Sequence, residues 1–110
     1  MEDLLKNVEE FLESGRENLS KNRFNAAVSD FFKAIVILCD YLIYKEIRVI
    51  PKNHNERFPL LERYFKDIYK KVSGFFGTYT KSYNLRLEKE KADELGRYAN
   101  ELKNFILNKK

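Results

Sequence analysis

His54 is the side chain in this sequence best suited to moving protons near neutral pH. It is the only histidine among the 110 residues, and histidine is the side chain whose charge ordinarily changes in that range. Arg48 precedes it with five residues between, and an arginine so placed could stabilise phosphate charge while the histidine transfers a proton. The segment between them contains Pro51 and is expected to be a loop, so chance explains this spacing more simply. We predict that no residue is catalytic and keep Arg48 and His54 as the alternative pair.

Two groups of cationic and aromatic side chains could bind a nucleotide or RNA. One group surrounds His54 and could hold phosphates. In the other group, Tyr79, Tyr83 and Arg86 are spaced to share one helical face, where they could stack on a base and hold its phosphate. A solvated loop explains the first group more simply, and core packing with a surface arginine explains the second more simply. The candidate nucleotide- or RNA-binding residues are Arg48, Lys52, His54, Arg57, Tyr79, Tyr83 and Arg86.

Metal and cofactor chemistry have little support in the sequence. Cys39 is the only cysteine, and with one histidine the chain lacks the ligand pairs of a zinc site. The four glycines form no phosphate-binding loop. Cys39 lies in an apolar run and is interpreted as a small core residue. We therefore expect neither a metal nor a cofactor.

Apolar residues recur every three or four positions along nearly the whole chain, which predicts helices. The glycines and prolines divide the pattern: Pro59 fits the first turn of a helix, and Ser73, Gly74 and Gly77 mark a looser stretch. No segment alternates like a strand. We predict one all-α domain over residues 1–110, a compact up-and-down bundle of four to five helices. The expected helical segments are 2–22, 25–47, about 59–72, 75–83 and 87–108.

The second of these helices has an unusual composition. Nearly every residue from Ala34 to Tyr44 is apolar, and a helix that is apolar all round must be covered on all sides. At eleven residues the run is too short to span a membrane. We therefore expect it to be covered by other helices and by a second copy of the chain, which predicts a homodimer. Asp40 lies within the run and needs a hydrogen-bonded or basic partner if it is buried.

The charge is unevenly distributed along the chain. Residues 1–40 carry five basic and eight acidic side chains, a net charge of −3, while residues 41–110 carry sixteen and nine, a net charge of +7. This asymmetry could give an electropositive side that attracts phosphates, or simply a solvated surface rich in lysine and glutamate. One free cysteine and an acidic beginning unlike a secretory leader predict a cytoplasmic protein.

The order of these features resembles the HEPN family, the "higher eukaryotes and prokaryotes nucleotide-binding" domains. The segment from Leu19 to Val28, with Phe24 before Ala27, looks like the family's first helix junction. The turn from Pro51 to His54 and the tyrosine–arginine segment that ends at Arg86 are similar to two further family features. The resemblance covers about residues 5–107 and rests on the ordered set, which includes Phe31, Phe32, Ala34, Phe58, Leu61, Tyr79, Tyr83, Ala92 and Ala99.

This resemblance implies a bundle that pairs into a dimer and is often a partner of a small nucleotidyltransferase, in several cases as a toxin–antitoxin pair. Ribonuclease members have an arginine, four to six residues and then a histidine. After Arg86 those positions hold Lys91, Ala92 and Asp93, and lysine is a poor proton shuttle at neutral pH. We therefore expect a non-catalytic interaction module that binds nucleotide or RNA. The alternatives are a metal-independent endoribonuclease toxin and a structural homodimer without separate activity.

Overall fold

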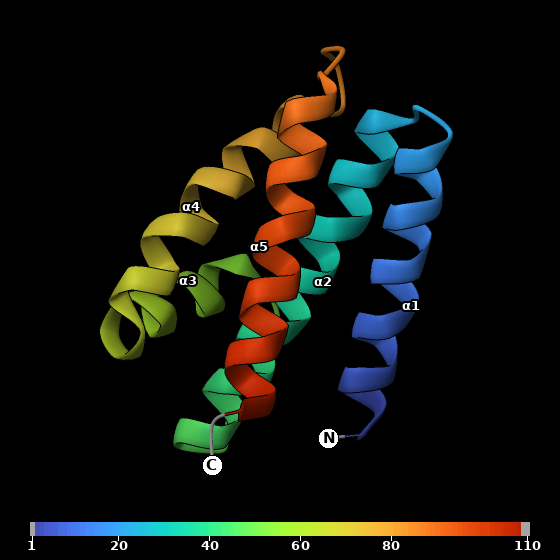
Figure 1. Ribbon diagram of the computed structural model, residues 1–110. Coiled ribbons are helices and arrows are strands. Elements are labelled where there is room, and N and C mark those ends of the chain that lie inside the picture. The colour runs from blue at the N-terminus through green and yellow to red at the C-terminus, as the bar shows by residue number, and fades with distance from the viewer. Residues whose placement is uncertain (1, 109–110) are drawn as a thin grey trace.

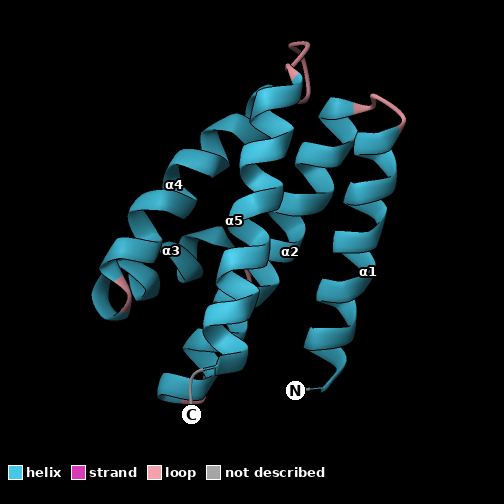
Figure 2. Ribbon diagram, in the orientation of Figure 1, coloured by secondary structure: helices cyan, strands magenta, loops and turns pink. Residues whose placement is uncertain are grey.

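Five helices and no strand make up residues 2–108, the part of the chain that the computed structural model describes (Figures 1 and 2). The four long helices run alternately up and down, and the short third helix packs beside the fourth at the back of Figure 1. The predicted all-α bundle is therefore confirmed. The helices are α1 (Glu2–Ser20), α2 (Phe24–Ile47), α3 (His54–Tyr64), α4 (Lys66–Lys81) and α5 (Lys89–Asn108).

Helix α2 is the centre of the bundle, and each of the other four helices packs against it. Its apolar run is covered largely by the chain itself, because Ile35, Leu38, Cys39 and Ile43 are all fully buried. Burial also raises the pKa of the Cys39 thiol, as expected for a core cysteine. The apolar run therefore does not by itself need a second copy to cover it, and the homodimer stays a prediction.

Phe31 is held between two glycines from neighbouring helices. Its ring is 2% exposed, and a Cβ built on Gly15 of α1 would lie 2.5 Å from it, while one built on Gly96 of α5 would lie 3.0 Å away. A Cβ at Gly15 would overlap the ring, and one at Gly96 would be tighter than ordinary van der Waals contact. The glycines therefore allow α1 and α5 to approach α2 closely on either side of one aromatic ring.

The boundaries of α3 and α4 differ from the sequence prediction. Helix α3 begins five residues before Pro59, because Asn53 caps it by accepting a hydrogen bond from the Glu56 backbone N–H at 3.0 Å. The chain then breaks at Phe65, where φ is −143° and ψ is 63°, rather than at Gly74. Both the predicted position of Pro59 and the predicted break near residues 73–77 are wrong. Gly74 lies inside α4, and a Cβ built there would have nothing within 4 Å, so no close packing requires a glycine at this position.

Asn25 fastens the connection between α4 and α5 to the start of α2. Its side-chain amide donates to the carbonyl oxygens of Ser82 and Leu85 at 2.8 and 2.6 Å, and its oxygen accepts from the Leu87 backbone N–H at 2.9 Å. Asn25 does not cap α2, which has no side-chain cap. One side chain instead satisfies three backbone groups of a distant loop.

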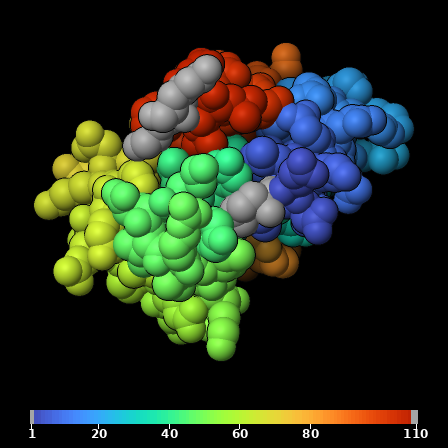
Figure 3. Space-filling model, turned by 90° about the horizontal axis from the view of Figure 1, so that it is seen from below, coloured from blue at the N-terminus to red at the C-terminus, as the bar shows by residue number. Residues whose placement is uncertain are grey.

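At the other end of the bundle, the segment between α2 and α3 carries the residues around His54. Seen from below in Figure 3, this segment (green) lies between α1 (blue) and the start of α4 (yellow). Among residues 2–108, no helix is both long enough and apolar enough to cross a bilayer.

Candidate functional site

A buried ion pair joins α2 to α3. Arg57 donates from Nε to Asp40 Oδ1 at 2.6 Å and from Nη2 to Oδ2 at 3.0 Å. The two residues are 6% and 8% exposed. Burial raises the pKa of the Asp40 carboxyl, and the guanidinium offsets part of that rise. The basic partner that a buried Asp40 was expected to need is therefore Arg57.

The same guanidinium determines which nitrogen of His54 carries a proton. Arg57 Nη1 lies 2.7 Å from His54 Nδ1, and since a guanidinium can only donate, Nδ1 must accept. The neutral ring then carries its hydrogen on Nε2. Partial burial lowers the pKa of His54, and the charge of Arg57 lowers it further. His54 is therefore a neutral hydrogen-bond donor through Nε2 at physiological pH.

Aromatic rings fix the plane of the imidazole. His54 stacks on Phe58 with ring centres 5.5 Å apart at 13°, and Phe76 of α4 lies 4.9 Å from it at a tilt. Phe32 of α2 stacks in turn on Tyr79 at 4.8 Å. Because His54 is held by an arginine and several rings, its donor direction is preorganised rather than free to rotate.

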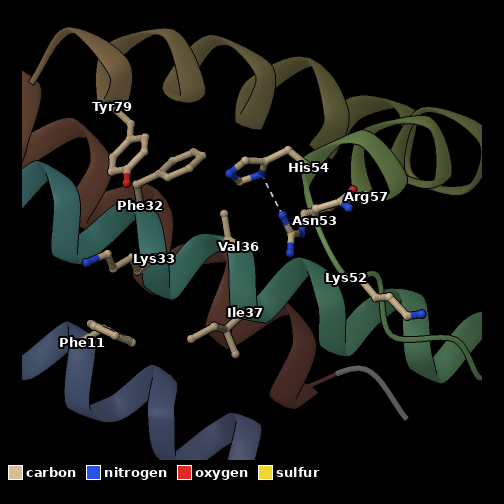
Figure 4. A pocket seen from close by; sticks show the side chains of 10 residues that line it. All are labelled: Phe11, Phe32, Lys33, Val36, Ile37, Lys52, Asn53, His54, Arg57 and Tyr79. Atoms are coloured by element: carbon tan, nitrogen blue, oxygen red, sulfur yellow. Dashed lines mark hydrogen bonds between the residues drawn. The ribbon is translucent and has the colours of Figure 1, made fainter. Parts of the chain in front are cut away.

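These residues border a groove of about 430 Å³ between α1, α2, α3 and α4. Val36 and Ile37 line it from α2, and Lys33 and Lys52 lie toward opposite ends with His54 between them (Figure 4). In the same view the His54 nitrogen that is not bonded to Arg57 lies on the side of Phe32, along the groove. The remaining lining residues are Phe11, Phe32, Asn53, Arg57 and Tyr79.

Four of the seven predicted binding residues meet in this groove, namely Lys52, His54, Arg57 and Tyr79. Arg48 is placed differently. It ends α2 in a left-handed conformation, and its guanidinium lies 5.3 Å from the centre of the Tyr44 ring. The arginine hydrogen-bonded to His54 is Arg57, three residues later rather than six residues earlier.

Tyr79, Tyr83 and Arg86 do not share one helical face, so that prediction is wrong. Helix α4 ends at Lys81, which leaves Tyr83 and Arg86 exposed in the connection to α5. The two tyrosines still meet, since their hydroxyl oxygens are 2.7 Å apart. Tyr79 therefore links the groove to the exposed connection, in which Tyr83 is 74% exposed.

Sequence reasoning missed the part of the groove that α1 and α2 supply. Lys33 lies over the Phe11 ring, with its Nζ 5.6 Å from the ring centre. The two residues are 22 positions apart, and no local pattern connects them. The available signal was the spacing of Lys33, Val36 and Ile37, which places a lysine beside two apolar residues on one face of α2.

The arrangement is better suited to binding than to acid–base catalysis. A general base at His54 would need a free ring nitrogen, but Nδ1 accepts from Arg57 and Nε2 carries the proton. Asp40 is engaged by Arg57 through both oxygens. What the groove offers a ligand is one imidazole N–H, two lysine ammonium groups and an apolar surface.

Comparison of the chain with protein-family models, with curated proteins and with solved structures gave no match. The HEPN resemblance therefore remains a hypothesis.

Proposed function

We propose that the protein is a non-catalytic binding module that holds a nucleotide, free or at an exposed position of RNA, in the groove at His54. The observation that carries the proposal is the contact between Arg57 and His54, which leaves Nε2 as a fixed donor. A phosphate or base acceptor can bind this N–H without any proton transfer.

The cationic and the apolar lining of the groove complement the two parts of a nucleotide. Lys33 and Lys52 are exposed ammonium groups suited to phosphate, and the charge of Arg57 is already compensated by Asp40. Val36, Ile37 and the ring of Phe11 are partly exposed and offer an apolar surface to a base. Phe32 is only 1% exposed, so it supports Tyr79 rather than stacking on the ligand itself.

The proposal includes the HEPN-like assignment and what it implies. The chain would act as a homodimer and as the partner of a small nucleotidyltransferase in a toxin–antitoxin-like pair. The connection between α4 and α5 supports a contact between copies, because Tyr83 and Leu85 are 74% and 54% exposed while Asn25 holds the backbone in place. Light scattering at tens of micromolar should give twice the monomer mass, and Tyr83→Asp with Leu85→Asp should halve it. A monomer in the unmodified protein would contradict the dimer.

A metal-independent endoribonuclease is the second candidate. The adjacency of an arginine and a histidine in one groove favours it, but the pair is Arg57 and His54 rather than Arg48 and His54. Catalysis would require His54 to break its hydrogen bond with Arg57 and to carry its proton on Nδ1 rather than on Nε2.

Calorimetric titration tests the binding proposal. We expect adenosine 5′-monophosphate to bind with a dissociation constant on the order of 100 μM, and inorganic phosphate to bind more weakly because it lacks a base. Lys33→Ala and Lys52→Ala should each weaken binding about fivefold, or about 1 kcal/mol. A short single-stranded RNA forms the third arm, and RNA binding without nucleotide binding would assign the groove to RNA.

Lys6→Ala is the matched control, because Lys6 is an exposed lysine of α1 outside the groove. It should leave the titration unchanged. Absence of binding at millimolar nucleotide, or an equal loss in Lys6→Ala, would contradict the proposal.

A further inference from the structure

Helices α4 and α5 border two hollows that lie on a different face of α4 from the groove. One hollow, of about 510 Å³, lies between the start of α4 and the end of α5, and the other, of about 250 Å³, lies farther along the same pair of helices. Since α4 and α5 run in opposite directions (Figure 1), the two hollows follow one another. We call them together the α4–α5 furrow.

The first hollow of the furrow is largely apolar. Ile68 of α4 and Leu102 of α5 line it, together with Tyr64, Tyr98 and Phe105. Tyr64 is 37% and Phe105 is 49% exposed. Charged residues at this end nearly balance, with Lys66 against Asp67 and Glu101. This end therefore offers apolar and aromatic contact area without a strong charge.

The second hollow is cationic. Lys70 and Lys71 come from α4 and Lys91 comes from α5, and all three are exposed. Glu94 is the only acidic residue that lines this hollow, and it lies 3.9 Å from the Lys91 ammonium. Gly74 also lines it, with nothing within 4 Å of the place where a Cβ would be. A partner can therefore approach the α4 backbone closely here and meet a net positive charge.

We propose that the α4–α5 furrow binds a helix of another protein whose contacting face carries apolar side chains at one end and carboxylates at the other. The furrow follows α4 from Phe65 to Thr78, a length of about 20 Å, which matches about fourteen helical residues. An apolar face that fills a groove between helices is a recurrent mode of peptide recognition. A bare polyanion would leave the apolar hollow unused.

This inference rests on the proposed role as an interaction module and deepens it, since it names the partner's chemistry and the surface that binds it. The carboxylates would meet Lys70 and Lys71, and this charge complementarity sets the orientation of the helix. The groove at His54 lies on another face of α4, so both surfaces can be occupied at once.

The test uses synthetic sixteen-residue peptides labelled with fluorescein and measured by anisotropy. One pair of peptides carries leucines on one face at one end and three glutamates at the other end, in both chain polarities. A second pair has lysines in place of the glutamates. We expect a glutamate peptide to bind with a dissociation constant on the order of 50 μM and the lysine peptides to bind at least tenfold more weakly.

Charge reversal of the furrow should reverse this preference. The double variant Lys70→Glu with Lys71→Glu should bind the glutamate peptide about tenfold more weakly and the lysine peptide more tightly. Phe105→Ser should weaken both about fivefold. The matched controls are Lys6→Glu with Arg16→Glu on α1, and Val49→Ser, whose parent residue is 46% exposed away from the furrow. Circular dichroism verifies that each variant is folded.

Four outcomes would overturn the inference. The first is no peptide binding below 1 mM, and the second is peptide binding that the furrow variants leave unchanged. The third is tight binding of an RNA oligonucleotide that requires Lys70 and Lys71. The fourth is a homodimer that Phe105→Ser dissociates. Titration of the same variants with adenosine 5′-monophosphate separates the two proposals. Nucleotide binding without peptide binding would contradict only the proposal for the furrow. Peptide binding without nucleotide binding would contradict only the proposal for the groove.

Discussion

Arg57 donates to both carboxylate oxygens of Asp40 and, with its remaining terminal nitrogen, to Nδ1 of His54. One side chain thus joins α3 to α2 and also fixes the tautomer of the histidine in the groove. The pair is almost completely buried, so each charge depends mainly on the other for its stabilisation. The position of His54 therefore depends on the integrity of the core ion pair.

Removal of Arg57 should destabilise the fold severely. Arg57→Ala leaves the Asp40 carboxylate buried without its cation, and we expect the free energy of unfolding to fall by about 3–5 kcal/mol. Urea unfolding followed by circular dichroism measures it. The double variant Asp40→Leu with Arg57→Leu should recover most of the loss, because both charges are then absent. A loss below about 1 kcal/mol in Arg57→Ala would show that water replaces the guanidinium.

Two glycine-to-alanine substitutions should act in opposite directions. Gly15→Ala drives a methyl group into the Phe31 ring, and we expect it to destabilise the protein by about 1–3 kcal/mol. Gly74→Ala meets open space in the middle of α4 and should stabilise it by about 0.5–1 kcal/mol through helix propensity. Thermal unfolding of the two variants decides the matter. If Gly15→Ala raises Tm as Gly74→Ala is expected to do, the Phe31 ring can move away from the added methyl group.

Stability should fall when the solution is acidified through the titration of His54. The folded-state pKa of His54 is lowered from its ordinary value, so below about pH 6.5 the unfolded chain binds a proton that the folded chain does not. The stabilisation is fully present above that pH and is lost as the pH falls through the folded-state pKa. Denaturant unfolding between about pH 7.5 and 5.5 should show a steeper decline than His54→Gln shows. Identical slopes would exclude His54 as the origin.

The purified protein should cleave RNA little or not at all. No histidine follows Arg86 at the spacing that ribonuclease members of the HEPN family have, and His54 presents no free basic nitrogen. The assay incubates a mixed RNA pool without divalent metal, alongside His54→Ala and Arg86→Ala. Robust cleavage that His54→Ala abolishes would make His54 catalytic. Cleavage abolished only by Arg86→Ala would place the active site in the connection between α4 and α5.

The sequence predicted the helical bundle well because α1, α4 and α5 carry clear apolar stripes, α2 is apolar nearly all round, and no segment alternates like a strand. The period does not locate the break at Phe65, where neither glycine nor proline interrupts it. The start of α3 was in principle readable, since Asn53 followed by Glu56 is a capping pattern. With that start recognised, His54 and Arg57 lie one turn apart on one helix.

The rest of the groove depends on tertiary packing and could not be predicted. Asp40 and Arg57 are seventeen residues apart, and only the packing of α3 on α2 brings their charges together. Arg86 was grouped with Tyr79 and Tyr83 by their spacing alone, but α4 ends at Lys81. Residue type and closeness in the sequence therefore identified four of the groove's residues but not their partners.

The most direct test of the binding proposal is an NMR titration of ¹⁵N-labelled protein with adenosine 5′-monophosphate. Before addition, the imidazole nitrogen shifts should show His54 neutral with its proton on Nε2. On addition, the largest changes should occur at that N–H and at the backbone amides of Lys33, Lys52 and Tyr79. Amides of α5 should stay unchanged. Shifts concentrated on α5 or at Arg86, with the His54 ring unaffected, would contradict the account.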